Sequence, residues 1–239
     1  MKKLLLLLAG LLSLTGCVPV DSLNPLYTDK DLAFDESLLG SWVGPDKGEE
    51  GGLEILAREQ DGKKSYILVM TDKNNSLNVL KKTIYHARLV KLNEHLFLDV
   101  VQESFESQSA PYFLQVKSGK TGPSIEPALL KLGEGAYLEF SGASPDSNGK
   151  VAANLRRAHW ILKAARKGKT LQLDWIDDEV FRKAVQAGTV KLPSTLLGEG
   201  KNKDVVITAS SQELQKFVAE HADDKALFEG KIAELHLKE

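Results

Sequence analysis

Residues 158–176, AHWILKAARKGKTLQLDWI, form the stretch that decides the fold, because two apolar runs flank a short basic turn at Arg166–Lys169. In the second run, Leu171, Leu173 and Trp175 alternate with polar residues. A two-residue period is typical of a β-strand that buries one face. We therefore expect the two runs to pair as an antiparallel β-hairpin.

Other short apolar stretches of the chain follow the same pattern. Two further hairpins are expected, formed by 53–58 and 65–71 around Asp61–Lys64, and by 83–90 and 95–102 around Lys91–Glu94. Single strands are expected at 39–43, 112–116, 135–140 and 203–208, with a long connection at 117–134. Short turns favour antiparallel neighbours, and about eight to ten such strands suffice for a closed barrel.

Two helices are expected late in the chain. The first is capped by Asp177 or Asp178 and ends before Gly188, and the second begins at Ser210 with Glu213 completing a capping box. The sequence thus predicts a mainly β protein. Its architecture is an antiparallel barrel or a strongly curved meander with two helices near the C-terminus, because closure removes exposed sheet edges.

The N-terminal residues have the pattern of an export signal. Met1–Lys3 is basic, Leu4–Leu14 is apolar, and the run ends in Leu14-Thr15-Gly16-Cys17. These last four residues resemble the lipobox of bacterial lipoproteins. The resemblance implies that the signal is cut before Cys17 and that this cysteine carries acyl chains in the membrane. The alternative, an uncleaved spanning helix, would need about 20 apolar residues.

The resemblance also implies a location. Val18 follows Cys17 where an aspartate would favour retention in the inner membrane of Gram-negative cells, so we expect an outer-membrane anchor facing the periplasm if the cell is Gram-negative. The expected organisation is a signal peptide (1–16), a lipidated tether (17–35) and a single barrel-like domain with a C-terminal helix (36–239). Leu26 is among the apolar tether residues that could dock on the domain.

Composition narrows the function classes. The chain has 31 basic and 33 acidic residues and a net charge of −2, without a long basic run, which argues against nucleic-acid binding. Cys17 is the one cysteine in the sequence, so the domain has neither a disulfide nor thiolate chemistry, and a packed core must supply its stability.

The stretch Phe34–Trp42 resembles the opening of lipocalin-like proteins, in which a helical turn precedes a first strand with Gly-x-Trp. The resemblance implies that Gly40 allows close backbone passage and that Trp42 plugs the closed end of a barrel. Arg156 or Arg157 are the candidates for the arginine that packs on this tryptophan. The "LLGSW" pattern after an anchor is also similar to uncharacterised bacterial lipoproteins, which brings no activity with it.

The aromatic residues expected on strands could line a ligand pocket or fill the core. These candidates are Trp42, Tyr66, Tyr85, Phe97, Phe140, Trp160 and Trp175.

Enzyme and metal motifs do not emerge from the sequence. Gly119–Thr121 and Gly168–Thr170 match only the last part of a phosphate-binding loop, and no zinc helix or nucleophile elbow occurs. His159 is expected to be a surface or edge histidine, because alternation turns it away from Trp160. The acidic pairs Glu49-Glu50, Asp177-Asp178 and Asp223-Asp224 are explained by helix capping or solvation.

Two functions are therefore open. The first is a non-enzymatic, membrane-anchored envelope lipoprotein that binds a small apolar ligand or lipid in a lipocalin-like barrel, without a cofactor or metal. The second is a structural or assembly adaptor with a filled core that binds other envelope proteins. A solid barrel interior would count against the first function.

Overall fold

The structure is a computed structural model that describes residues 19–44, 52–74, 79–102, 112–115, 128–133, 136–140, 150–198, 203–228 and 230–238. Cys17 and the rest of the expected signal lie outside these ranges. Of the two helices in the described part, neither has the length and hydrophobicity to cross a bilayer.

Eight strands of the described chain close into an antiparallel barrel, which confirms the expected fold class. Their order around the ring is their order along the chain, as in an up-and-down lipocalin-type barrel. The ring consists of β3 (Gly40–Val43), β4 (Gly52–Gln60), β5 (Lys63–Asn74), β6 (Val79–Leu92), β7 (His95–Gln102), β12 (Trp160–Lys167), β13 (Thr170–Trp175) and β16 (Gly230–Leu237). It closes where β16 pairs with β3.

The expected hairpins are confirmed, and their turns explain why they form. β4 and β5 are joined by Asp61 and Gly62, with φ of 52° and 73°, the left-handed conformation that two-residue hairpin turns require. Asn93 has a φ of 53° in the turn between β6 and β7, and Gly168 has a φ of 61° between β12 and β13. Glycine, asparagine and aspartate tolerate this conformation best.

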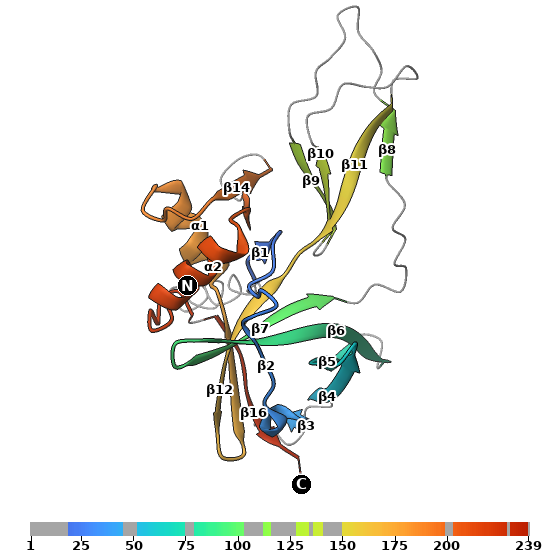
Figure 1. The fold of residues 1–239 in the computed structure, drawn as a ribbon, viewed down its shortest axis with the longest axis vertical. Coiled ribbons are helices and arrows are strands. Elements are labelled where there is room, and N and C mark those ends of the chain that lie inside the picture. The colour runs from blue at the N-terminus through green and yellow to red at the C-terminus, as the bar shows by residue number, and fades with distance from the viewer. Residues whose placement is uncertain are drawn as a thin grey trace, which may run out of the picture.

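Two long insertions interrupt the ring (Figure 1). The first follows β7 and forms a separate sheet in the order β8-β11-β10-β9. Its strands are β8 (Tyr112–Gln115), β9 (Ala128–Gly133), β10 (Ala136–Phe140) and β11 (Lys150–Arg157). β9 lies in a region that the sequence presented as a long connection, because its apolar residues stand among glycines, prolines and serines.

The second insertion follows β13 and contains α1 (Asp178–Gln186), β14 (Ser194–Leu197), β15 (Asp204–Ile207) and α2 (Ser211–Glu220). Both expected helices are confirmed. Asp177 caps α1 by accepting from the Val180 amide, and Ser210 and Glu213 form the capping box of α2.

Residues 19–35, the described part of the expected tether, pack against the folded body. β1 (Asp21–Ser22) pairs in parallel with β15, and β2 (Leu32–Ala33) pairs with β6. Val20, Leu23 and Leu26 are buried, because the apolar side chains of this segment pack against the second insertion and the barrel wall. The short 3-10 helix η1 (Glu36–Leu38) then leads into β3.

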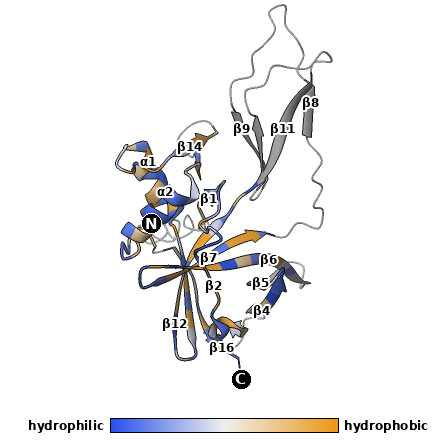
Figure 2. Cartoon of the chain, viewed as in Figure 1, coloured by the Kyte–Doolittle hydropathy of each residue, from blue (hydrophilic) through white to orange (hydrophobic). Residues whose placement is uncertain are grey.

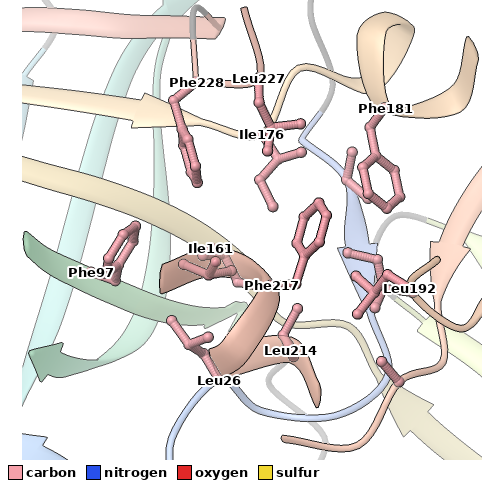
Figure 3. Close-up of a cluster of buried hydrophobic side chains, with 14 of the residues drawn as sticks. Leu26, Phe97, Ile161, Ile176, Phe181, Leu192, Leu214, Phe217, Leu227 and Phe228 are labelled. Carbon is pink, nitrogen blue, oxygen red and sulfur yellow. The ribbon is translucent and has the colours of Figure 1, made fainter. Parts of the chain in front are cut away.

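The described chain has two main apolar cores, and strand alternation separates them. Figure 2 shows hydrophobic and hydrophilic residues alternating along the barrel strands. Inward side chains form the barrel core, which includes Trp42, Ile55, Tyr66, Leu98 and Leu171. Outward side chains of β6, β7 and β12 instead join the helical layer in an outer core (Figure 3), which includes Val90, Phe97, Ile161, Phe181, Phe217 and Phe228.

Candidate functional site

The closed end of the barrel is built around Trp42. Its indole N–H donates to the Leu38 carbonyl of η1 over 2.9 Å, and the side chain is completely buried. Gly40 has a φ of 136°, and a Cβ at this position would lie 2.7 Å from Cδ1 of Leu237. Glycine is favoured here chiefly by its φ, because the Leu237 methyl is the flexible end of a side chain and could turn aside.

The guanidinium over Trp42 belongs to Arg166, whereas Arg157 donates to the Gln102 carbonyl and the side chain of Arg156 lies outside the described ones. The guanidinium carbon of Arg166 lies 5.5 Å from the centre of the Trp42 ring, and its Nη1 donates to the Ser37 carbonyl. Inward side chains of β12 occupy every second position, and Arg166 continues that series after Leu162 and Ala164 at the closed end. From the sequence alone Arg166 belongs to a basic turn, although the alternation along β12 already indicates that its side chain faces the barrel interior.

Tyr66 is held in place beside this end. Its hydroxyl accepts from the Asp35 amide over 2.7 Å and donates to the Asp35 carbonyl over 3.2 Å, while its ring stacks on Phe34 at 4.8 Å. Burial raises the pKa of Tyr66 to about 12, although the Asp35 backbone hydrogen bond works in the opposite direction. The residue therefore acts as a neutral structural hydrogen-bonding group.

The barrel core is tightly packed around Trp42 and Tyr66 and opens toward Met70, an interior-facing residue that is 38 % exposed. Its buried members expose at most 7 % of their surface, and they come from every strand of the ring and from η1. A cavity that admits a water would give its lining residues accessible surface. The expected pocket residues Trp42 and Tyr66, each 0 % exposed, therefore fill the interior of the barrel.

Three other expected pocket residues gather at the opposite end, which we call the barrel mouth. Tyr85, Trp160 and Trp175 are partly buried and pack against the barrel core. The rings of Tyr85 and Trp160 lie 5.5 Å apart, and the Trp160 indole N–H donates to Asp21 over 2.7 Å. The Trp175 indole N–H is buried and has no hydrogen-bond partner in the described part of the chain.

Phe97 and Phe140 do not join this group. Phe97 points out of the barrel into the outer core, where it contacts Phe228 at 5.9 Å between ring centres. The expectation that it lines the barrel is wrong because β7 turns Leu96 and Leu98 inward and Phe97 outward. Phe140 lies on β10, and its side chain is outside the described ones.

His159 points away from Trp160 as expected, but it is not on the surface. Its Nδ1 lies 2.7 Å from Oδ1 of Asp99, and the two side chains are 16 % and 1 % exposed. The other Asp99 oxygen accepts from the Leu26 amide over 2.6 Å. Sequence reasoning missed Asp99, although a charged residue between Leu98 and Val100 in an apolar strand is itself a signal of a buried contact.

A cavity lies outside the barrel, on the wall formed by β4 to β7. We call it the outer-wall pocket. Its volume is about 380 Å³, and Tyr27 and Leu32 of the N-terminal segment line it together with the strands. Its cationic side chains are Arg58, Lys63, Lys64 and Arg88, and His86 lies in contact with Arg58. The pocket was not foreseen, because the residues that form it come from four separate segments.

The remaining candidate groups have structural explanations or lie elsewhere. Gly168–Thr170 is a hairpin turn, and Asp224 caps the backbone amides of Ala226 and Leu227. Gly119–Thr121 and Glu49-Glu50 lie outside the described residues. Within the described ranges, histidine, cysteine and carboxylate side chains nowhere gather in a group of three that could hold a metal ion.

Comparison with known proteins gives no relative from which to transfer a function. Neither a family model, nor a curated protein, nor a solved structure matches the chain.

Proposed function

We propose that the protein is a lipid-anchored envelope protein, non-enzymatic and without a cofactor, whose barrel is a solid scaffold that binds other envelope components through its outer surface. The filled barrel core carries this proposal. A side chain such as Trp42 or Tyr66, with no accessible surface, leaves no room for a ligand beside it. The filled interior favours the adaptor function over binding of an apolar ligand deep in the barrel.

The anchor remains the one suggested by Leu14–Cys17. If Cys17 is acylated, only Val18 separates it from Pro19, which forms a β-bridge with Asp177. Adjacent Cα atoms are about 3.8 Å apart, so the anchored body would lie directly against the membrane surface. Two or more acyl chains would make that attachment stable, and a partner would be met in the periplasm next to the outer membrane in a Gram-negative cell.

Replacing Cys17 with serine tests the anchor in cells. The parent should incorporate labelled palmitate and sediment with membranes. The variant should lose the label and retain its uncleaved signal, which raises its apparent mass. A variant that is labelled and fractionates as the parent does would refute the lipoprotein assignment.

A photo-crosslinking amino acid placed at one of two positions tests whether a partner protein contacts the outer surface or the barrel mouth. Leu56 (42 % exposed) lies on the outer face of β4, because its neighbour Ile55 is in the barrel core. Met70 (38 % exposed) pairs with Leu53 of the barrel core and therefore faces the interior near the mouth. We expect a discrete protein adduct from Leu56 and none from Met70. Adducts from Met70 alone would contradict an outer-surface function.

A small apolar ligand at the barrel mouth is the second candidate function. It is favoured by the partly exposed rings of Tyr85 and Trp160, which offer apolar surface. The indole N–H of Trp175, which lacks a partner among the described residues, would donate to an acceptor atom on such a ligand. Native mass spectrometry of the gently purified full-length protein distinguishes it from the first. A bound mass that disappears in Trp175→Phe and persists in the surface variant Lys183→Gln would establish mouth binding.

A further inference from the structure

We propose that the outer-wall pocket binds a phosphate-type oxyanion, and that Arg58 and Arg88 are its principal ligands. The pocket lies on the outside of the barrel, so this inference does not depend on the adaptor function or on the anchor. It rests on the placement of the two arginines, on their present partners, and on the shape of the cavity.

The strand registers place both arginines on one face. Arg58 of β4 pairs with Ser65 of β5, and Arg88 of β6 pairs with Asp99 of β7. Paired residues in an antiparallel sheet share a face. Both pairs lie on the outer face, because Tyr66 and Ala87, the neighbours of Ser65 and Arg88, pair with each other in the barrel core.

Neither guanidinium has an anionic partner in the described part of the chain. Arg58 donates to a ring nitrogen of His86 and, over 2.9 Å, to the side-chain oxygen of Gln60. Arg88 donates to the Tyr27 hydroxyl and lies 4.5 Å from the centre of that ring. None of these partners carries a negative charge, so neither guanidinium is neutralised by its present contacts.

Two acidic residues line the pocket: Asp61, in the turn between β4 and β5, and Asp99, in β7. Asp99 uses both oxygens, one for the Leu26 amide and the other for His159. Lys63 and Lys64 reach the exposed carboxylates of Asp29 and Glu36 at 2.9 and 3.4 Å, contacts weak enough in water to exchange for a bound anion. Among the described residues, the pocket thus combines two arginines that lack an anionic partner with two lysines that can be recruited.

The number and direction of these donors indicate the class of ligand. A planar carboxylate is satisfied by one arginine, whereas a phosphate group carries more charge and offers oxygens in several directions. Here donors approach from β4, β5 and β6, and the Ser65 hydroxyl lies between the two arginine strands. A volume of about 380 Å³ leaves room for an organic group attached to the phosphate, beside the apolar Leu32 and Val101.

Titration calorimetry of the full-length protein in non-ionic detergent, at low salt, tests the site with inorganic phosphate and glycerol 3-phosphate. We expect binding of at least one probe. Arg58→Gln and Arg88→Gln should each weaken it by about tenfold or more, because each removes charged hydrogen bonds, and the double variant should abolish it. Arg58→Lys keeps the positive charge but not the two parallel N–H donors of the guanidinium, so it should lose less affinity for the probes than Arg58→Gln does.

Lys183→Gln is the matched control, since it removes one exposed positive charge from α1 and should bind as the parent does. Melting temperatures verify that the arginine variants are folded. Equal affinity in the parent and the folded double variant would overturn the proposal.

A flotation assay with phosphatidylcholine vesicles, with and without phosphatidic acid, distinguishes the two sources of a phosphate group. Binding of phosphatidic acid vesicles that needs Arg58 and Arg88, without binding of the free probes, would assign a lipid headgroup. Binding of the free probes would assign a soluble phosphate compound. Absence of binding in both assays would overturn the site.

Discussion

The guanidinium of Arg166 lies over the indole of Trp42, 5.5 Å from the ring centre, and donates to the carbonyl of Ser37. This contact joins the end of β12 to η1 and β3, which adjoin each other but lie far from β12 in the sequence. Because Trp42 itself donates to Leu38 in η1, the helical turn is held from both sides. The closed end of the barrel is therefore fixed by one cation–π contact and two hydrogen bonds.

Arg166→Ala should lower the free energy of unfolding by about 1 to 2 kcal/mol, since it removes the cation–π contact and a charged hydrogen bond at an exposed side chain. Urea denaturation followed by tryptophan fluorescence measures the change. Arg166→Lys retains the charge and should cost less than the alanine variant. An alanine variant as stable as the parent would mean that the contact contributes nothing.

Gly40→Ala should lower the free energy of unfolding by about 2 to 3 kcal/mol, chiefly because L side chains rarely adopt a φ of 136°, with a smaller part from displacing the end of Leu237. Gly168→Ala is the matched control, since its φ is 61° and no atom lies within 4 Å of the place that an added methyl would take. The control should cost only about 1 kcal/mol. Equal losses of unfolding free energy in the two variants would show that the backbone and surroundings of Gly40 add no cost of their own.

Asp99→Asn should destabilise the fold by about 2 to 4 kcal/mol. Both carboxylate oxygens accept hydrogen bonds, and an amide would present a donor to one of the two existing donors. Asp29→Asn makes the same chemical change in an exposed ion pair with Lys63 and should cost less than about 1 kcal/mol. Hydrogen exchange at the Leu26 amide should accelerate in the first variant and remain unchanged in the second.

Stability should fall between pH 10 and pH 12 because the pKa of Tyr66 rises from its ordinary value of 10.0 to about 12 in the fold. Above pH 10 the unfolded chain releases the phenolic proton while the folded chain retains it, so the unfolded state is favoured. Tyr66→Phe should be less stable than the parent at pH 9, and the difference should shrink as the pH approaches 12. Parallel stability curves for the two proteins would contradict this role.

Much of the barrel was predictable because its signals are local. Hairpin turns at Asp61-Gly62 and at Gly168 use residues that adopt a left-handed conformation, and alternation in the adjoining strands indicates which side chains face inward. The helix caps at Asp177 and Ser210 are equally local, since each is satisfied within three residues.

The features that escaped prediction depend on distant partners. β16 pairs with β13 and with β3, and its own sequence, GKIAELHL, alternates too weakly to stand out after Ala226–Phe228. The segment 19–35 resembled a tether because its short apolar groups have no period of their own. Their burial depends on β15 and the outer core.

The candidate sites also differ in whether their signals are local or depend on distant parts of the chain. Aromatic residues on strands identified the barrel core, but their spacing does not distinguish a filled interior from a hollow one. The outer-wall pocket needs Arg58 and Arg88 from non-adjacent strands and Tyr27 from the N-terminal segment, and only the tertiary structure brings them together.

The position of β16 has a consequence for how the chain behaves during synthesis and folding. It is the last strand of the ring to leave the ribosome, and it covers the open edges of both β3 and β13. A nascent or truncated chain that stops before Gly230 therefore displays two unsatisfied strand borders, which invite aggregation and proteolysis. Pairing of β16 with both neighbours therefore removes two template edges at once.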